Sequence, residues 1–180
     1  KFYYRYVNEL KEPARVSAEI DPAMMGNLLH DIMKRIYIDH TNEVLSKDLI
    51  DRVVRDKKNL VALIRDTTSA VAGRNFSMKS DGNILITNDI LEEYVSRILY
   101  CDRTLVPFRI THLETQCDFG ISILSDTRKV RAGGIIDRID EVKGCVRIVD
   151  YKTGKTSERI PSVSDLFTKG RSKDYDAWLQ

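Results

Sequence analysis

Apolar positions in the first half of the chain recur at helical spacing. The pair Asp21-Pro22 is a helix start signal, because Asp can cap the end and Pro suits the first turn. An apolar stripe follows from residue 25 to residue 36. Ser46 is expected to cap a second helix, and residues 60–71 predict a third, which ends near Gly73. The pair Asp81-Gly82 predicts a turn, and Asn88 is expected to cap a further helix through residue 99.

After Pro107 the pattern changes to that of β-strands. Residues 108–124 contain an alternation of apolar and polar side chains, and residues 130–140 and 145–152 predict two more strands. Turns are expected at Asp126-Thr127 and at Lys143-Gly144. The tail is polar, with a short helix expected at residues 164–167 and another from Asp174 onward. Helices followed by a β-meander and a helix predict an α/β fold, with a central mixed sheet flanked by helices and a helical first half.

Composition narrows the class of protein. The 180 residues are 42% apolar and 31% charged, which suits one globular domain and argues against disorder. The net charge of +2 does not by itself indicate a nucleic-acid partner. No stretch is long and apolar enough to predict a membrane span, and three widely spaced cysteines do not predict a disulfide framework, so we expect a cytoplasmic protein. The chain lacks an initial Met, and both ends fall in helical patterns, so we expect a single domain, 1–180, truncated at both ends.

The most informative residues flank the predicted Lys143-Gly144 turn. Asp137 lies six residues before Lys143, and Asp150 lies six residues after Gly144, so an antiparallel hairpin places the two carboxylates opposite each other. Lys152 is two residues beyond Asp150 and shares its face. Opposed carboxylates repel, and a divalent cation such as Mg²⁺ or Mn²⁺ would compensate their charge. The alternative is a surface hairpin with ordinary charges, because an Asp-x-Lys triplet alone is common.

Two longer motifs surround these residues. Gly134-Ile-Ile-Asp137-Arg138 and Asp150-Tyr-Lys-Thr-Gly154 resemble the G-x-x-D-R and D-Y-K-T-G motifs of RecB/AddB-like nucleases in the PD-(D/E)XK nuclease superfamily. Gly26-Asn-Leu-Leu-His30 resembles the G-x-x-x-H helix of the same nucleases. The opening Lys1-Phe-Tyr-Tyr-Arg-Tyr is similar to a segment of AddB-like proteins. The resemblance implies a restriction-endonuclease-like core.

The resemblance also implies roles for single residues. Asp137, Asp150 and Lys152 would be catalytic, and His30, Asp137, Asp150 and the Tyr151 carbonyl would hold the metal. His30 lies off the apolar stripe of its helix, and its protonation at acidic pH should reduce activity. The Tyr151 side chain points to the other face and is expected to pack. Further candidates are Glu114, as an additional acidic group, and Gln180, where the family's Q-x-x-x-Y motif would begin.

These residues together predict a metal-dependent DNA nuclease, of exonuclease type, tethered to a helicase or helicase-like module of recombination and repair. Arg131 and Lys155 belong to a basic group that could follow a DNA backbone. An iron–sulfur cluster, which AddB-like relatives carry, is neither supported nor excluded: the family's cluster cysteines lie before and after this region, and the three cysteines here do not match them. Within the same class, a stand-alone exonuclease or a restriction-type endonuclease stays open. From a different class, the alternative is a non-catalytic DNA-binding or scaffolding module that retains the fold.

Overall fold

The computed structural model describes residues 22–74, 81–122, 129–154, 159 and 162–168. Several predicted features lie outside these residues: the cap at Asp21, the turn at Asp126-Thr127, and the helix from Asp174. Among the described residues, the helical elements are α2 (Pro22–Tyr37), η1 (Ile38–His40), α3 (Lys47–Arg55), α4 (Lys57–Arg74), α5 (Asp81–Leu105) and η2 (Val163–Phe167). The strands are β1 (Val44–Leu45), β2 (Phe108–Ser122), β3 (Lys129–Val142) and β4 (Cys145–Val149).

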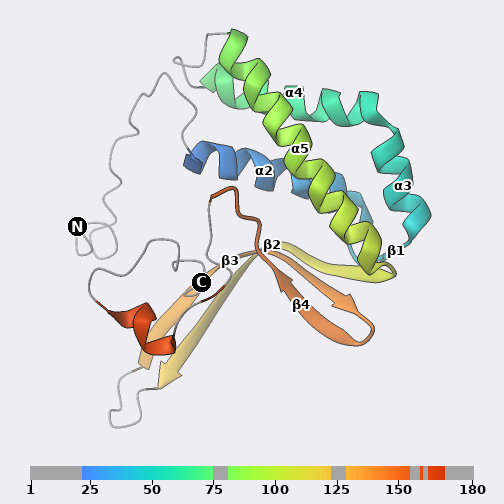
Figure 1. Ribbon diagram of the computed structural model, residues 1–180. Helices are drawn as coiled ribbons and strands as arrows, with labels where there is room; N and C mark the ends of the chain where they lie inside the picture. The colour runs from blue at the N-terminus through green and yellow to red at the C-terminus, as the bar shows by residue number, and fades with distance from the viewer. Residues whose placement is uncertain (1–21, 75–80, 123–128, 155–158, 160–161, 169–180) are drawn as a thin grey trace.

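The strands form one sheet in the order β1-β2-β3-β4, and each strand is antiparallel to its neighbours. The α/β class predicted from the sequence is therefore confirmed, whereas the parallel strand of a mixed sheet is not among the described residues. Figure 1 shows the helices α2 to α5 gathered on one side of the sheet, while the far ends of β2 and β3 extend away from them.

The core lies between the helices and this face of the sheet. Phe108 and Ile110 of β2 are fully buried in this core. The buried apolar residues of the two central helices are Leu28, Leu29, Ile32 and Met33 of α2 and Leu91, Val95 and Leu99 of α5. Their helical spacing reproduces the stripes seen in the sequence.

Helix starts were predicted with mixed success. Ser46 caps α3 as predicted, because its hydroxyl accepts a hydrogen bond from the Leu49 amide at 3.4 Å. The predicted turn at Asp81-Gly82 and the predicted cap at Asn88 are wrong, because α5 begins at Asp81 and runs through both. The reason is that Thr87 continues the buried stripe one turn before Leu91 and bonds its hydroxyl to the Asn83 carbonyl. A polar residue in the core stripe hid the true start of the helix.

Candidate metal and catalytic site

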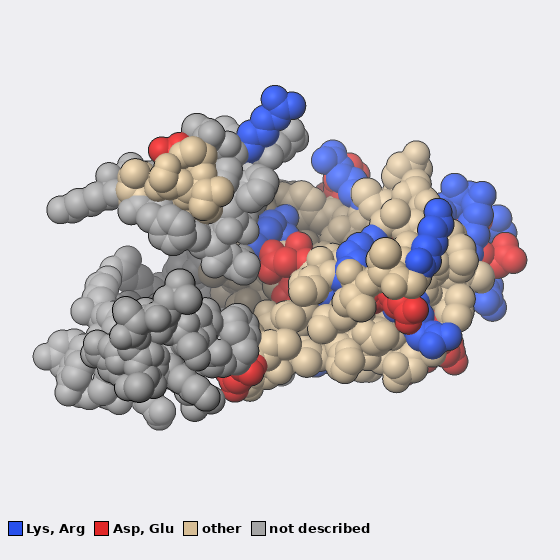
Figure 2. All heavy atoms as spheres, turned by 90° about the horizontal axis from the view of Figure 1, so that it is seen from below, with Lys and Arg blue, Asp and Glu red and all other residues tan. Residues whose placement is uncertain are grey.

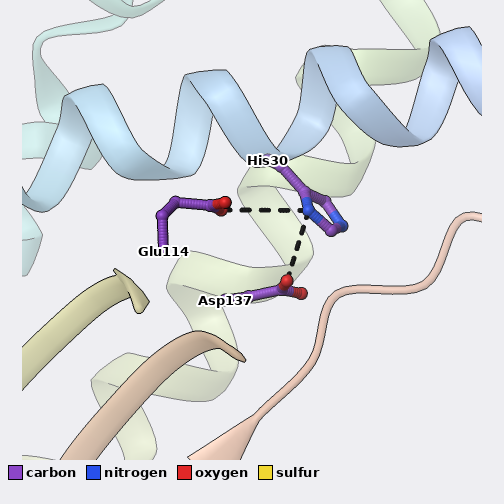
Figure 3. A group of neighbouring side chains, drawn as sticks. All are labelled: His30, Glu114 and Asp137. Carbon is purple, nitrogen blue, oxygen red and sulfur yellow. Dashed lines mark ion pairs between the residues drawn. The ribbon is translucent and has the colours of Figure 1, made fainter. Parts of the chain in front are cut away.

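Three elements bring acidic and imidazole groups together at one point. His30 comes from α2, Glu114 from β2 and Asp137 from β3, and Figure 3 shows both carboxylates directed at the imidazole. His30 Nδ1 lies 3.3 Å from Asp137 Oδ1 and 3.9 Å from Glu114 Oε1. One ligand atom from each of the three residues lies within 4.8 Å of the others. Asp137 is buried, with 5% of its side chain exposed, whereas His30 and Glu114 are about a quarter exposed, at 27% and 26%. The group is therefore partly accessible to solvent.

The β3–β4 hairpin has the register predicted from the sequence. Arg138 pairs with Val149 and Ile139 with Ile148, and the turn is at Lys143-Gly144. The predicted third strand is too long, because β4 ends at Val149 rather than at Lys152. Asp137 and Asp150 thus stand one step beyond the last ladder pair. The chain turns there so that the Tyr151 amide donates a hydrogen bond to Asp137 Oδ2 at 2.6 Å. That bond holds Asp137 in place and leaves its other oxygen for His30.

Tyr151 also fixes the histidine. Its carbonyl oxygen lies 2.9 Å from His30 Nε2, and because a carbonyl only accepts, Nε2 must carry the proton. In neutral His30 the lone pair is then on Nδ1, the nitrogen that faces Asp137 and Glu114. Lone pairs from one nitrogen and two carboxylates converge, an arrangement that a metal cation between them would stabilise. A metal-ligating histidine typically donates its other ring N–H to a carbonyl or carboxylate, as Nε2 does here. The side chain of Tyr151 is buried against the core, as predicted.

Asp150 and Lys152 form a pair beside this group rather than within it. Lys152 Nζ lies 3.1 Å and 2.8 Å from the two oxygens of Asp150, and the side chains are 35% and 43% exposed. Both charges still act on Asp137: Asp150 raises the pKa of that carboxyl, and Lys152 lowers it. The predicted trio is thus adjacent in space, but Lys152 engages Asp150 and not Asp137.

Burial is the main influence on Asp137. It raises the pKa of the carboxyl, and the Tyr151 amide and His30 only partly offset this. A carboxylate that is costly to ionise gains most from a neighbouring cation. The carboxylate oxygens of this donor set suit Mg²⁺ or Mn²⁺, and an imidazole nitrogen is a common ligand of divalent transition metals. The residues present therefore fit a divalent metal ion.

The Gly-x-x-x-His motif of α2 and the Asp-Tyr-Lys-Thr-Gly motif after β4 lie in contact next to His30. A Cβ atom at Gly26, one turn before His30 in α2, would lie 3.7 Å from Thr153 Oγ1. The first half of α2 therefore runs close to the segment that follows β4. This contact explains how a histidine 121 residues from Tyr151 in sequence reaches its carbonyl.

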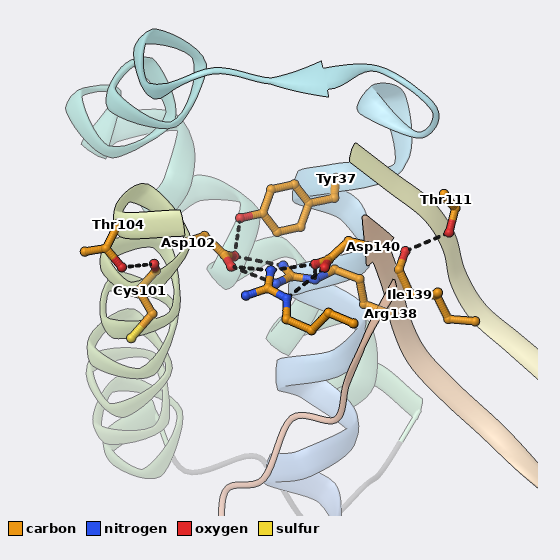
Figure 4. A network of polar contacts seen from close by, with 9 residues as sticks. Tyr37, Cys101, Asp102, Thr104, Thr111, Arg138, Ile139 and Asp140 are labelled. Atoms are coloured by element: carbon orange, nitrogen blue, oxygen red, sulfur yellow. Dashed lines mark hydrogen bonds and ion pairs between the residues drawn. The ribbon is translucent and has the colours of Figure 1, made fainter. Parts of the chain in front are cut away.

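A buried network that sequence reasoning missed lies beside Asp137, between β3 and the helices (Figure 4). Arg138 is 1% exposed and donates two hydrogen bonds to Asp102 of α5, at 2.8 and 2.7 Å. Tyr37 of α2 donates to the same carboxylate at 2.7 Å. Arg138 Nε lies 3.1 Å from Asp140, an ion pair that is not aligned as a hydrogen bond. The signal in the sequence that could have revealed this network was Arg138 itself, the arginine of the Gly-x-x-Asp-Arg motif, directly after Asp137.

The same guanidinium lies over aromatic rings. Its central carbon is 5.3 Å from the ring centre of Tyr37, 5.5 Å from that of Phe108 and 5.6 Å from that of Tyr151. Burial by itself lowers the pKa of Arg138, but the hydrogen bonds to Asp102 and nearby negative charge raise it, so the group stays charged. Because Tyr151 contacts Arg138 with its ring and Asp137 and His30 with its backbone, the network and the site share one residue.

Some predicted residues cannot be placed. Gln180 and Lys155 lie outside the described residues, and Arg131 lies in β3 with its side chain outside them. Figure 2 shows one face of the molecule, on which the Lys and Arg side chains of the described part are interspersed with Asp and Glu rather than gathered in one basic area. On this face, the described side chains show no basic area that would mark a path for DNA. No helix among the described residues is both long enough and apolar enough to span a membrane.

The described part of this α/β domain gathers a histidine and two carboxylates beside a lysine, a donor set that could hold a divalent cation. Residues 1–169 match the family model of the PD-(D/E)XK nuclease superfamily, and the chain belongs to this superfamily. No match to a curated protein or to a solved structure was found. The restriction-endonuclease-like fold predicted from the sequence is confirmed, and membership implies a nuclease domain that hydrolyses phosphodiester bonds, with DNA as substrate. Nucleases of this superfamily generally depend on a divalent metal.

Proposed function

We propose that the chain is a Mg²⁺- or Mn²⁺-dependent deoxyribonuclease domain whose site is built around Asp137. The observation that carries this proposal is the convergence of His30 Nδ1, Glu114 and Asp137 with the Nε2 proton already committed to Tyr151. His30, Glu114 and Asp137 would hold the metal. Asp150 would be a further ligand from the adjacent turn. The Tyr151 carbonyl already accepts a hydrogen bond from His30, so it would bind the metal through its second lone pair.

The residues of the chain have separate tasks in this mechanism. A bound divalent cation would supply Lewis acidity toward the phosphodiester. Tyr151 holds His30 in the tautomer that presents Nδ1, and its amide orients Asp137. Lys152, held by Asp150 at the edge of the group, would orient the attacking water and stabilise negative charge as it develops on the phosphate.

The wider context is proposed from the sequence resemblance alone. The RecB/AddB-like motifs favour an exonuclease that forms one domain, 1–180, of a larger protein, tethered to a helicase or helicase-like module in recombinational repair. An exonuclease requires an end, so it should digest linear DNA and leave covalently closed circular DNA intact. Digestion of both forms at equal rates would favour an endonuclease instead.

Lys152→Ala tests the catalytic claim. We expect cleavage of linear DNA in Mg²⁺ or Mn²⁺ to fall about 100-fold or more, because a positioned proton-transfer or charge-stabilising group contributes about that much. Binding of Mn²⁺, measured by calorimetry, should change little. The matched control is Lys143→Ala, which removes an exposed lysine at the hairpin tip and should leave cleavage unchanged.

Two outcomes would count against the proposal. Cleavage by Lys152→Ala at the rate of the unchanged chain would remove Lys152 from the mechanism. A folded chain that binds DNA without cleaving it, alone or with its flanking segments, at any divalent-metal concentration would favour the non-catalytic module.

A further inference from the structure

Strand β2 contains a β-bulge three residues before Glu114. Ile110 pairs with Asp140, yet His112 pairs with Ile139, so Thr111 is an extra residue in β2. The Thr111 side chain closes the bulge, because its hydroxyl donates a hydrogen bond of 3.1 Å to the Ile139 carbonyl on β3. Ile139 is the residue that faces the bulge.

The bulge decides which side chain stands across from Asp137. Beyond it, Leu113 pairs with Arg138 and Thr115 with Ile136, so Glu114 falls opposite Asp137. Without the extra residue, the register of Ile110 and Asp140 would continue, and Leu113 would take the place of Glu114. A shift of one residue moves every later side chain to the other face of the sheet.

The apolar pattern requires the same shift. Phe108 and Ile110 are buried in the core, two residues apart, and the next residue of β2 that packs against the core is the partly buried Leu113, three residues later. A regular strand cannot place all three on one face. The bulge therefore keeps Leu113 on the core and places Glu114 on the side of Asp137.

The backbone at Glu114 is also unusual. Its φ of 49° lies in the left-handed region, which disfavours residues other than glycine, and only a few described residues share it. Sheet neighbours on both sides hold it there, since Leu113 and Thr115 are both paired with β3. Strain of this kind persists where the surrounding structure imposes it, and it is concentrated at functional sites.

We propose that Thr111 is a positioning residue of the metal site: the bulge that it closes sets the register that brings Glu114, in a strained conformation, across from Asp137. The functional part of this inference, the effect of Thr111 on metal binding, rests on the proposed metal site. The structural part, the bulge and the strain at Glu114, does not depend on any metal.

The functional part is tested by Mn²⁺ titration calorimetry on the full chain. Thr111→Val keeps the branched shape and removes the hydroxyl, and Mn²⁺ affinity should fall about 3- to 10-fold, the worth of one hydrogen bond. Thr111→Ser restores the hydroxyl and should bind within about twofold of the unchanged chain. The matched control is Thr104→Val, which loses an equivalent hydroxyl-to-carbonyl bond to Cys101 at the end of α5 and should bind as before.

The structural part is tested by melting Glu114→Gly and Glu114→Ala in metal-free buffer. Glycine tolerates a positive φ, so the Gly variant should melt about 2–8 °C above the Ala variant. In a regular extended strand the order would be reversed, because glycine weakens strands. An Ala variant that melts higher would overturn the inference even if Thr111→Val failed to fold.

The two proposals fail in different ways. If Asp137→Asn abolishes Mn²⁺ binding but Thr111→Val binds as the unchanged chain does, the positioning role of Thr111 is wrong and the metal site stands. If the unchanged chain binds no Mn²⁺, the proposed function fails, and the proposed role of Thr111 in metal binding fails with it.

Discussion

At the scale of single residues, Asp137 and Asp150 differ more than their motif suggests. Asp137 is buried, accepts a hydrogen bond from the Tyr151 amide and faces His30. Asp150 is 43% exposed and already paired with Lys152. Loss of Asp137 should therefore remove the proposed metal ligand around which the others are arranged, whereas loss of Asp150 removes a solvated charge.

Thermal melting with and without Mn²⁺ distinguishes the two carboxylates. At a Mn²⁺ concentration about 100 times its dissociation constant, binding should stabilise the chain by about 2.7 kcal/mol, or about 5–10 °C. Asp137→Asn should lose nearly all of this shift, and Asp150→Asn should keep part of it. The reverse order would show that the metal is centred on Asp150 and that the His30 group serves another purpose.

The sequence predicted this site only in part, for physical reasons. Counting outward from Lys143-Gly144 predicted the hairpin register correctly as far as the pair Arg138 and Val149, one step short of Asp137 and Asp150, because a two-residue turn fixes the register. Counting cannot reveal a bulge in the neighbouring strand, so Glu114 stayed a secondary candidate although it lies within the group. The spacing of Ile110 and Leu113 was the available signal.

At the scale of elements, the β3–β4 turn sets the geometry that the site needs. Lys143 and Gly144 both have positive φ, at 51° and 78°, and they are the only residues between Val142 and Cys145, which pair. This is the form of a tight two-residue hairpin turn, which favours Asn-Gly. Both residues are exposed, so substitutions there change backbone preference and not packing.

Opposite effects are expected at these adjacent positions. Lys143→Asn should raise the free energy of unfolding by several tenths of a kcal/mol, because Asn tolerates the left-handed region better than Lys. Gly144→Ala should lower it by about 1–2 kcal/mol, because the added Cβ disfavours that conformation. Urea denaturation measures both. Equal effects of the two substitutions would contradict the positive φ at this turn.

Elements whose apolar pattern is regular were predicted well, and those with a polar interruption were not. The stripe of α2 and the cap of α3 are where the sequence placed them. The start of α5 was missed because Thr87 lies in its buried stripe. The requirement for glycine at position 133 could not be predicted from the sequence either. A Cβ there would collide with the Cys117 carbonyl of the neighbouring strand, and no local pattern reveals such a contact.

At the scale of the whole molecule, one buried arginine joins the helical layer to the sheet. Arg138 of β3 bonds Asp102 of α5, and its guanidinium lies over rings from α2, from β2 and from the segment after β4. The site residues His30 and Asp137 come from two of the elements that this network connects. No spacing rule predicts the contact between Arg138 and Asp102, because these two residues are 36 positions apart in the sequence.

Replacing Arg138 should therefore cost far more than replacing an arginine at the surface. Arg138→Met leaves Asp102 and Asp140 buried without their full set of counter-charges, which typically destabilises a protein by about 3–5 kcal/mol. The matched control is Arg103→Met, which breaks the pair between Arg103 and Asp51, 39% and 17% exposed. That partly solvated pair should contribute only about 1 kcal/mol or less.

Urea denaturation measures the loss of stability in both variants. A second substitution, Asp102→Asn, added to Arg138→Met, then distinguishes the effect of the unpaired charge from the effect of lost packing. If the loss in Arg138→Met comes from an uncompensated carboxylate, adding Asp102→Asn should return part of it, because the amide still bonds Tyr37 without a buried charge. A double variant that loses the sum of both single effects would mean that Arg138 acts through its ring contacts alone. In that case Tyr151 should be displaced, and the Mn²⁺-dependent rise in melting temperature should disappear even where the fold survives.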